Sequence, residues 1–162
     1  PELVNVLRRV RDWTLHSEPL VCWEAQRLLK EIAGAVDGVM EHVLMEWVVS
    51  DDPSKMRIVA HILHGFNGGP GFYRVTRELL VRTDDEKVSG ALMAAIGTTP
   101  GVISGPFSAF HRQRIQEVEP WLSDESFRVR AFAQRVIAIQ RESMEQELAR
   151  EALEERIWPK TP

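Results

Sequence analysis

Two histidines spaced three residues apart, His61 and His64, are the side chains of this sequence that could most directly bind a metal. On a helix, that spacing lets two imidazoles converge. A structural zinc site needs about four ligands, however, and the sequence has no HExxH motif and no cysteine nearby. We therefore predict no metal site and interpret the pair as surface or interfacial histidines.

The glycine-rich segment GFNGGPG, residues 65–71, and Ser104 are the other candidates for chemistry. Backbone amides at a helix start attract phosphate, but this segment lacks the Lys-Ser or Lys-Thr of a phosphate-binding loop. Ser104 lies in GVISGP, which does not match the G-x-S-x-G nucleophile motif, and no strand pattern precedes it. We predict no catalytic and no cofactor-binding residue, and hence a protein that is not an enzyme.

Aromatic and basic residues could together bind nucleic acid, because bases stack on tryptophan and phosphates pair with arginine. Of the five tryptophans, three occupy equivalent positions near expected helix ends, which favours packing over base stacking: Trp13, Trp47 and Trp121. The basic residues are dispersed, and the nearest to clusters are Arg8, Arg9, Arg11, Arg112 and Arg114. Nucleic-acid binding therefore stays an alternative function.

The elements that position these residues are best defined in residues 121–137, WLSDESFRVRAFAQRVI. Ser123 and Asp124 are residue types that cap a helix N-terminus. Apolar residues then recur at helical spacing, at positions 129, 132, 133, 136 and 137. The pattern predicts a helix that begins at about Asp124.

The same frame recurs upstream of this stretch. From Asp124, the frame places Val five, Arg six and Ala nine residues onward, and from Asp51 it finds Met56, Arg57 and Ala60. Trp121 and Trp47 precede these aspartates by three and four residues. Weaker copies begin at His16 and Asp84, so the anchors are 35, 33 and 40 residues apart. This period is typical of a helical solenoid.

The pattern D-x4-V-R-x2-A resembles the second helix of HEAT repeats, including the short bacterial variety. The resemblance implies an all-α fold, an α-α superhelix of about four antiparallel helical hairpins. It also implies that turn aspartates and helix arginines, Asp51 with Arg57 and Asp124 with Arg130, contribute to a ladder between adjacent repeats. Cys22 and Ser89 interrupt that ladder. Family members do many different things, and some HEAT-like proteins excise damaged DNA bases.

Helices are expected over residues 2–15, up to Ala33, 39–48, 53–63, 72–80 and 84–96. The connector at residues 97–106, GTTPGVISGP, holds three glycines and two prolines. It is interpreted as an inserted loop between repeats, with a functional loop as the alternative.

Composition agrees with a helical binding protein of one domain over residues 1–162. With 24 acidic and 20 basic residues among 162, the net charge of −4 provides no overall attraction to nucleic acid. One cysteine excludes a disulfide framework and suits a cytoplasmic location. No apolar run reaches membrane-spanning length. Because the sequence begins at Pro1 without a methionine, we expect a fragment of a larger protein.

The C-terminal region predicts one long helix, because no Gly or Pro interrupts residues 124–158 and its length would be about 50 Å. One interpretation is a capping helix that folds back or protrudes. The other is a docking surface for a partner or a second copy, formed by Met144, Leu148, Leu153, Ile157 and Trp158.

These observations favour a non-catalytic protein–protein interaction or scaffolding module that binds another protein or other domains of its own chain. A nucleic-acid-binding HEAT-like domain, DNA-glycosylase-like in its activity, is the alternative. We expect no cofactor.

Overall fold

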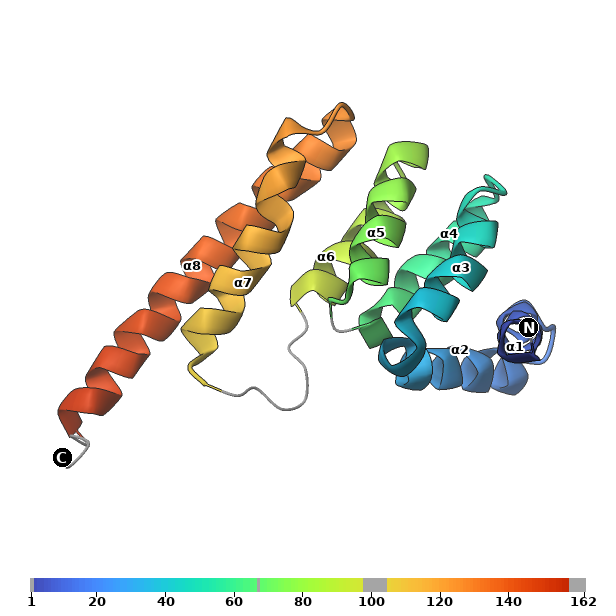
Figure 1. Ribbon diagram of the computed structural model, residues 1–162, viewed down its shortest axis with the longest axis horizontal. Helices are drawn as coiled ribbons and strands as arrows, with labels where there is room; N and C mark the ends of the chain where they lie inside the picture. The colour runs from blue at the N-terminus through green and yellow to red at the C-terminus, as the bar shows by residue number, and fades with distance from the viewer. Residues whose placement is uncertain (1, 67, 98–104, 158–162) are drawn as a thin grey trace. The chain divides into compact units, whose positions relative to one another are not determined.

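The computed structural model describes residues 2–66, 68–97 and 105–157. Over these residues the chain forms eight α-helices and three short 3₁₀ turns, with no strand (Figure 1). The predicted all-α class is confirmed. Most of the loop at residues 97–106 lies outside the described residues, as does Trp158.

Contacts within the chain define two compact units, Pro1–Thr98 and Thr99–Pro162. The expected single domain over residues 1–162 stays a prediction, and each unit is described by itself.

The first unit contains three helical hairpins, whose successive members pack in two layers. Helices α1, α3 and α5 contact one another in order, and so do α2, α4 and α6. In Figure 1 the α3–α4 and α5–α6 hairpins lie side by side, whereas α1 is seen nearly end-on. The six helices are α1 (Glu2–Trp13), α2 (Pro19–Ala33), α3 (Asp37–Val48), α4 (Pro53–Ile62), α5 (Pro70–Arg82) and α6 (Glu86–Gly97).

The start of the second helix in each hairpin is encoded locally. Asp52 caps α4 by accepting hydrogen bonds from the backbone amides of Ser54 and Lys55, at 2.9 and 3.3 Å. Pro53 occupies the first turn, as Pro19 does in α2, because a first-turn amide needs no helical partner. Asp85 accepts from the amide of Lys87 at the start of α6. The residues before α2, α4 and α6 are thus Glu18, Asp52 and Asp85, 34 and 33 residues apart.

The core of the first unit comes from apolar residues that both layers share. Its largest fully buried side chains are Leu7, Leu29, Met40, Leu44, Ile62, Leu63, Phe72, Leu79, Leu92 and Ile96. This burial is the main stabilising contribution, since removing apolar area from water yields roughly 25 cal/mol per Å².

The glycine-rich segment at residues 65–71 permits close backbone packing. Gly65 lies in the 3₁₀ turn η2 (Leu63–Phe66), and a Cβ atom added there would stand 1.9 Å from the carbonyl oxygen of Lys30. The amide of Gly71 donates to a carboxylate oxygen of Asp37 at 3.1 Å. These glycines therefore let η2 approach the end of α2 and let α5 approach α3.

The second unit is a single antiparallel hairpin of α7 (Phe107–Val118), the 3₁₀ turn η3 (Glu119–Ser123) and the long α8 (Phe127–Ile157). Ser108 near the start of α7 contacts Glu151 late in α8, while Trp121 of η3 lies near Phe132 early in α8. The 31 residues of α8 span about 46 Å, so the predicted long C-terminal helix is confirmed. It begins three residues later than predicted, because Asp124 adopts an extended conformation, ψ 148°.

Candidate protein-binding surface

The C-terminal stripe expected to dock a partner does not form one face of α8. Met144 is half-buried, whereas Leu148, Leu153 and Ile157 are exposed. A helix turns about 100° per residue, so Leu153 lies about 140° around the axis from Leu148. Met144 and Leu148 therefore share one side, and Leu153 and Ile157 lie on another.

The same part of α8 has a structural role that the sequence did not reveal. Pro106 precedes α7 and makes no side-chain cap for it. Glu151 supplies one from α8, because its carboxylate accepts hydrogen bonds from the backbone amide and the hydroxyl of Ser108, at 3.1 and 2.8 Å. These bonds lower the pKa of Glu151 below its usual value. The helix is therefore required at least as far as Glu151 to cap α7.

The aspartates and arginines predicted to form a ladder lie in two different settings. In the first unit, Arg57 pairs with Asp85 at 2.6 Å, and Asp51 pairs with Arg82 at 3.0 Å, so both connect α3–α4 to the next hairpin. Asp51 adopts a left-handed conformation, φ 55°, in the turn.

In the second unit, Asp124 accepts from the amide of Ser126, the residue before the first of α8, at 2.8 Å. Arg130 donates to the backbone carbonyls of Asp124 and Glu125, at 2.7 and 2.9 Å. Arg130 thus stabilises its own turn.

The three tryptophans at equivalent positions differ in exposure. Trp47 is buried, and Trp121 is half-buried with its ring 6.5 Å from that of Phe132. Trp13 is 53% exposed. The expectation that all three are packing residues is therefore wrong for Trp13, because a repeat position does not itself provide the neighbours that bury a side chain.

Within the first unit, exposed apolar side chains are concentrated on the α1–α2 hairpin. Of the nine large exposed hydrophobic residues described in the first unit, seven belong to this hairpin; the other two are Val49 and Val81. We call the seven the first-hairpin apolar set: Leu3, Val6, Trp13, Leu15, Leu20, Trp23 and Leu28. Such a concentration on one element is typical of a surface that binds another macromolecule.

Sequence reasoning missed this set for an identifiable reason. Leu20 directly follows Pro19 in a helix whose buried residues are Ala25, Leu29 and Ala33. Counting 100° per residue places Leu20 about 180° and Trp23 about 120° from Leu29. The signal available in the sequence was this apolar pair, spaced three residues apart on the side of the helix away from the core.

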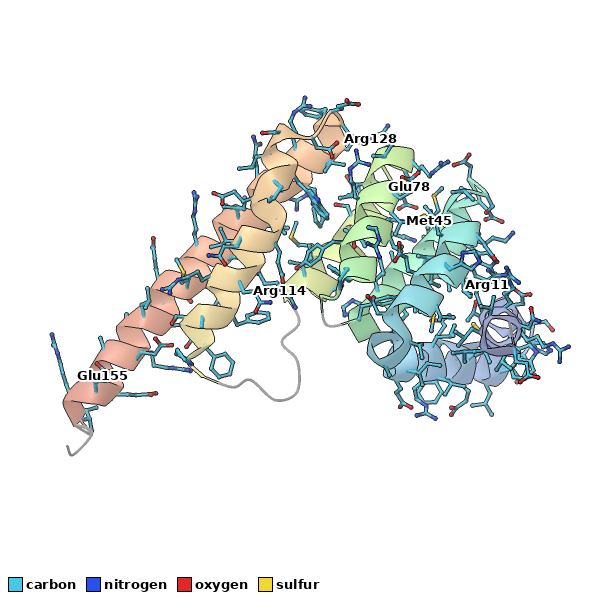
Figure 2. The ribbon with its side chains drawn as sticks, in the orientation of Figure 1. Arg11, Met45, Glu78, Arg114, Arg128 and Glu155 are labelled. Carbon is cyan, nitrogen blue, oxygen red and sulfur yellow. The ribbon has the colours of Figure 1, made fainter. Side chains whose placement is uncertain are left out.

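Beside this set, the contact between α1 and α3 combines charge with an aromatic ring. Arg11, labelled in Figure 2, extends from α1 to α3, where it donates to Glu46 and to the carbonyl oxygen of Val43, both at 2.7 Å. Its guanidinium carbon lies 4.7 Å from the centre of the Trp47 ring, and Lys55 lies 5.7 Å from the same ring.

Glu46 accepts hydrogen bonds from two arginines of α1. Arg8 donates three hydrogen bonds to Glu46, two of them from Nε, and Arg11 adds a fourth. The bonds from Arg8, followed by those from Arg11, lower the pKa of Glu46 to about 2 against the opposing effect of burial. This carboxylate is therefore ionised at every physiological pH.

The two histidines considered as metal ligands belong to a small basic cluster. Lys30 Nζ and His61 Nε2 are 2.6 Å apart, and the rings of His61 and His64 are 6.1 Å apart. Burial and the charge of Lys30 lower the pKa of both histidines. Within residues 2–66, 68–97 and 105–157, no three His, Cys, Asp or Glu side chains are placed to hold a metal ion.

The arginines of the first unit are largely paired with carboxylates. The pairs include Arg27 with Glu24 and Glu31, Arg57 with Asp85, Arg74 with Glu41, and Arg82 with Glu78 and Asp51. Each pair reduces the positive charge available to a phosphate backbone. None of the helices described here is both long and apolar enough to cross a lipid bilayer.

A scan against protein-family models, a search of curated proteins and a search of solved structures each returned no match.

Proposed function

We propose that this chain is a non-catalytic protein-binding module built on HEAT-like helical hairpins, and that it binds its partner through the first-hairpin apolar set. The observation that carries the proposal is that seven of the nine exposed large hydrophobic side chains described in the first unit lie on α1–α2. Tryptophan side chains at the centre of an interface often contribute most of the binding energy. Trp13 and Trp23, both more than half exposed, are the candidates for that role.

The carboxylate pairing of arginines in the first unit supports protein binding over the nucleic-acid alternative. A gel shift with damaged and undamaged duplex DNA compares the two functions. We expect no salt-dependent shift with either duplex at micromolar protein. Binding that weakens steeply with salt would favour the nucleic-acid-binding alternative.

The partner surface is tested by site-specific photo-crosslinking in cells of the source organism. A photoreactive phenylalanine analogue at Trp23 should yield a discrete adduct, and a Leu20→Ser substitution should abolish it while leaving the helical circular dichroism unchanged. Val49, exposed in the turn of the next hairpin, is the matched control position and should yield no adduct. Equal adducts from both positions would contradict the proposed surface.

A further inference from the structure

The first two hairpins present the same tryptophan in two states. Trp13 and Trp47 are 34 residues apart, the same spacing as Pro19 and Pro53, which begin α2 and α4. They therefore occupy equivalent positions. Trp47 is 5% exposed and Trp13 is 53% exposed.

The cover on Trp47 includes an arginine of the preceding hairpin. Arg11 of α1 lies over the Trp47 ring and donates to Glu46, the residue just before it. The equivalent pair in the first hairpin is Trp13 and Asp12, where an acid again directly precedes the tryptophan. In the described residues, no cation lies over Trp13, and the side chain of Asp12 is 59% exposed.

Asp12 already orients toward a guanidinium. Its Oδ1 atom accepts from Arg11 at 3.0 and 3.1 Å, and the carboxylate still offers acceptor sites on Oδ2. The acid and the adjacent ring thus reproduce the chemistry of Glu46 and Trp47 without the incoming arginine.

We propose that Trp13 and Asp12 bind an arginine from an amphipathic α-helix of another protein. The guanidinium would stack on the Trp13 ring and pair with Asp12, as Arg11 does with Trp47 and Glu46. The apolar face of that helix would cover neighbouring members of the first-hairpin apolar set. This inference rests on the proposed protein-binding function and specifies the partner as an arginine-bearing helix.

The α1 helix itself supplies a probe, because it carries Arg8 and Arg11 on the face that covers Glu46 and Trp47. A fluorescently labelled, lactam-bridged peptide with the sequence of residues 2–13 is titrated into the full chain and followed by anisotropy. A matched peptide replaces Arg8 and Arg11 with glutamine. We expect the glutamine peptide to bind on the order of tenfold more weakly.

Variants of the protein locate the binding. Trp13→Ala and Asp12→Asn should each weaken binding of the arginine peptide by about fivefold or more, whereas the control Val49→Ala should change it less than twofold. Binding that neither variant affects would overturn the proposal, because the peptide would then have displaced the protein's own α1.

Three further outcomes would overturn this inference, and the first of them leaves the proposed function intact. If both peptides bind equally and Leu20→Ser abolishes binding, the surface binds helices without an arginine and only the inference is overturned. If the protein alone forms a dimer by light scattering that Trp13→Ala disrupts, the occupant is a second copy and the inference is likewise overturned. Absence of peptide binding at protein concentrations up to about 100 μM, a dissociation constant that corresponds to about 5.5 kcal/mol of binding free energy, would also overturn the inference.

Discussion

The α3–α4 and α1–α2 hairpins have the same register but different surroundings. Trp47 in the α3–α4 hairpin is covered by Arg11 and Lys55, whereas Trp13 in the α1–α2 hairpin is exposed. A repeat sequence therefore specifies where a tryptophan lies along its helix, and the neighbouring element decides whether that tryptophan is core or surface.

The tryptophan pair should show the largest contrast. Trp47→Ala removes a buried ring and should lower the free energy of unfolding by about 3–5 kcal/mol. Trp13→Ala should cost less than about 1 kcal/mol, because its ring already contacts water. Urea unfolding followed by circular dichroism measures both, and similar losses from the two substitutions would show that Trp13 is a packing residue.

The acids that precede the tryptophans should differ in the same direction. Glu46→Gln removes one of the two carboxylates that pair with the buried guanidinium of Arg11, together with the carboxylate partner of Arg8, and should cost about 1.5–3 kcal/mol. Asp12→Asn should cost under about 0.5 kcal/mol, since the side chain of Asp12 is 59% exposed and Glu46 still pairs with Arg11. Comparable effects at both positions would contradict the contrast between the covered and exposed hairpins.

The Glu46 pair also predicts a pH dependence. Its pKa of about 2 in the fold is lower than in the unfolded chain, so the unfolded state binds more protons as pH falls. The stabilisation is therefore complete above about pH 5 and is lost as pH falls towards 2. Glu46→Gln should flatten the measured dependence of unfolding free energy on pH in that window, and an unchanged slope would argue against the pair.

Helix α8 extends the comparison to the second unit. Glu151→Gln removes the charged cap of α7 and should lower the midpoint of thermal unfolding, whereas Glu155→Gln, at an exposed position labelled in Figure 2, should have no measurable effect. Truncation after Glu142 should destabilise the hairpin for the same reason, so loss of binding in that truncation would not identify a docking stripe. Truncation after Glu151 keeps the cap, and destabilisation equal to that of the shorter protein would contradict this role.

The smallest effect concerns His61. Burial, the charge of Lys30 and that of His64 keep the pKa of His61 below its usual value. The contribution of neutral His61 to the free energy of unfolding is therefore present above about pH 6.5, and it is lost as the pH falls through the lower pKa of the folded state. His61→Gln should slightly reduce the stability change between about pH 7.5 and 5, measured by thermal unfolding, because His61 is exposed and water screens the charge of Lys30. A larger change in the variant than in the parent would contradict the assignment.

Local signals in the sequence were sufficient for most of the helices, although α7 was not among those expected. Pro19, Pro53 and Asp52 mark helix starts through backbone chemistry that needs no tertiary contact, and the uninterrupted segment after Asp124 gave the length of α8. The start of α8 was misplaced because Asp124 accepts from Ser126 before the helix begins.

The surfaces were harder to predict than the helices. Whether Trp13 is exposed depends on a partner for its ring, just as the burial of Trp47 depends on Arg11, which lies 36 residues earlier in the chain. The cap that Glu151 gives α7 is a contact over 43 residues. The grouping of Met144 with Ile157, in contrast, could have been corrected from helical periodicity alone.

If the proposed function is correct, the first-hairpin apolar set is covered by a partner in the cell. Hydroxyl-radical footprinting can compare oxidation of Trp13 and Trp23 in intact cells with that in the purified protein. Phe127, which is 73% exposed, serves as the internal reference. Oxidation of both tryptophans should fall several-fold in cells relative to Phe127, whereas equal oxidation in cells and in the purified protein would rule out a covered surface.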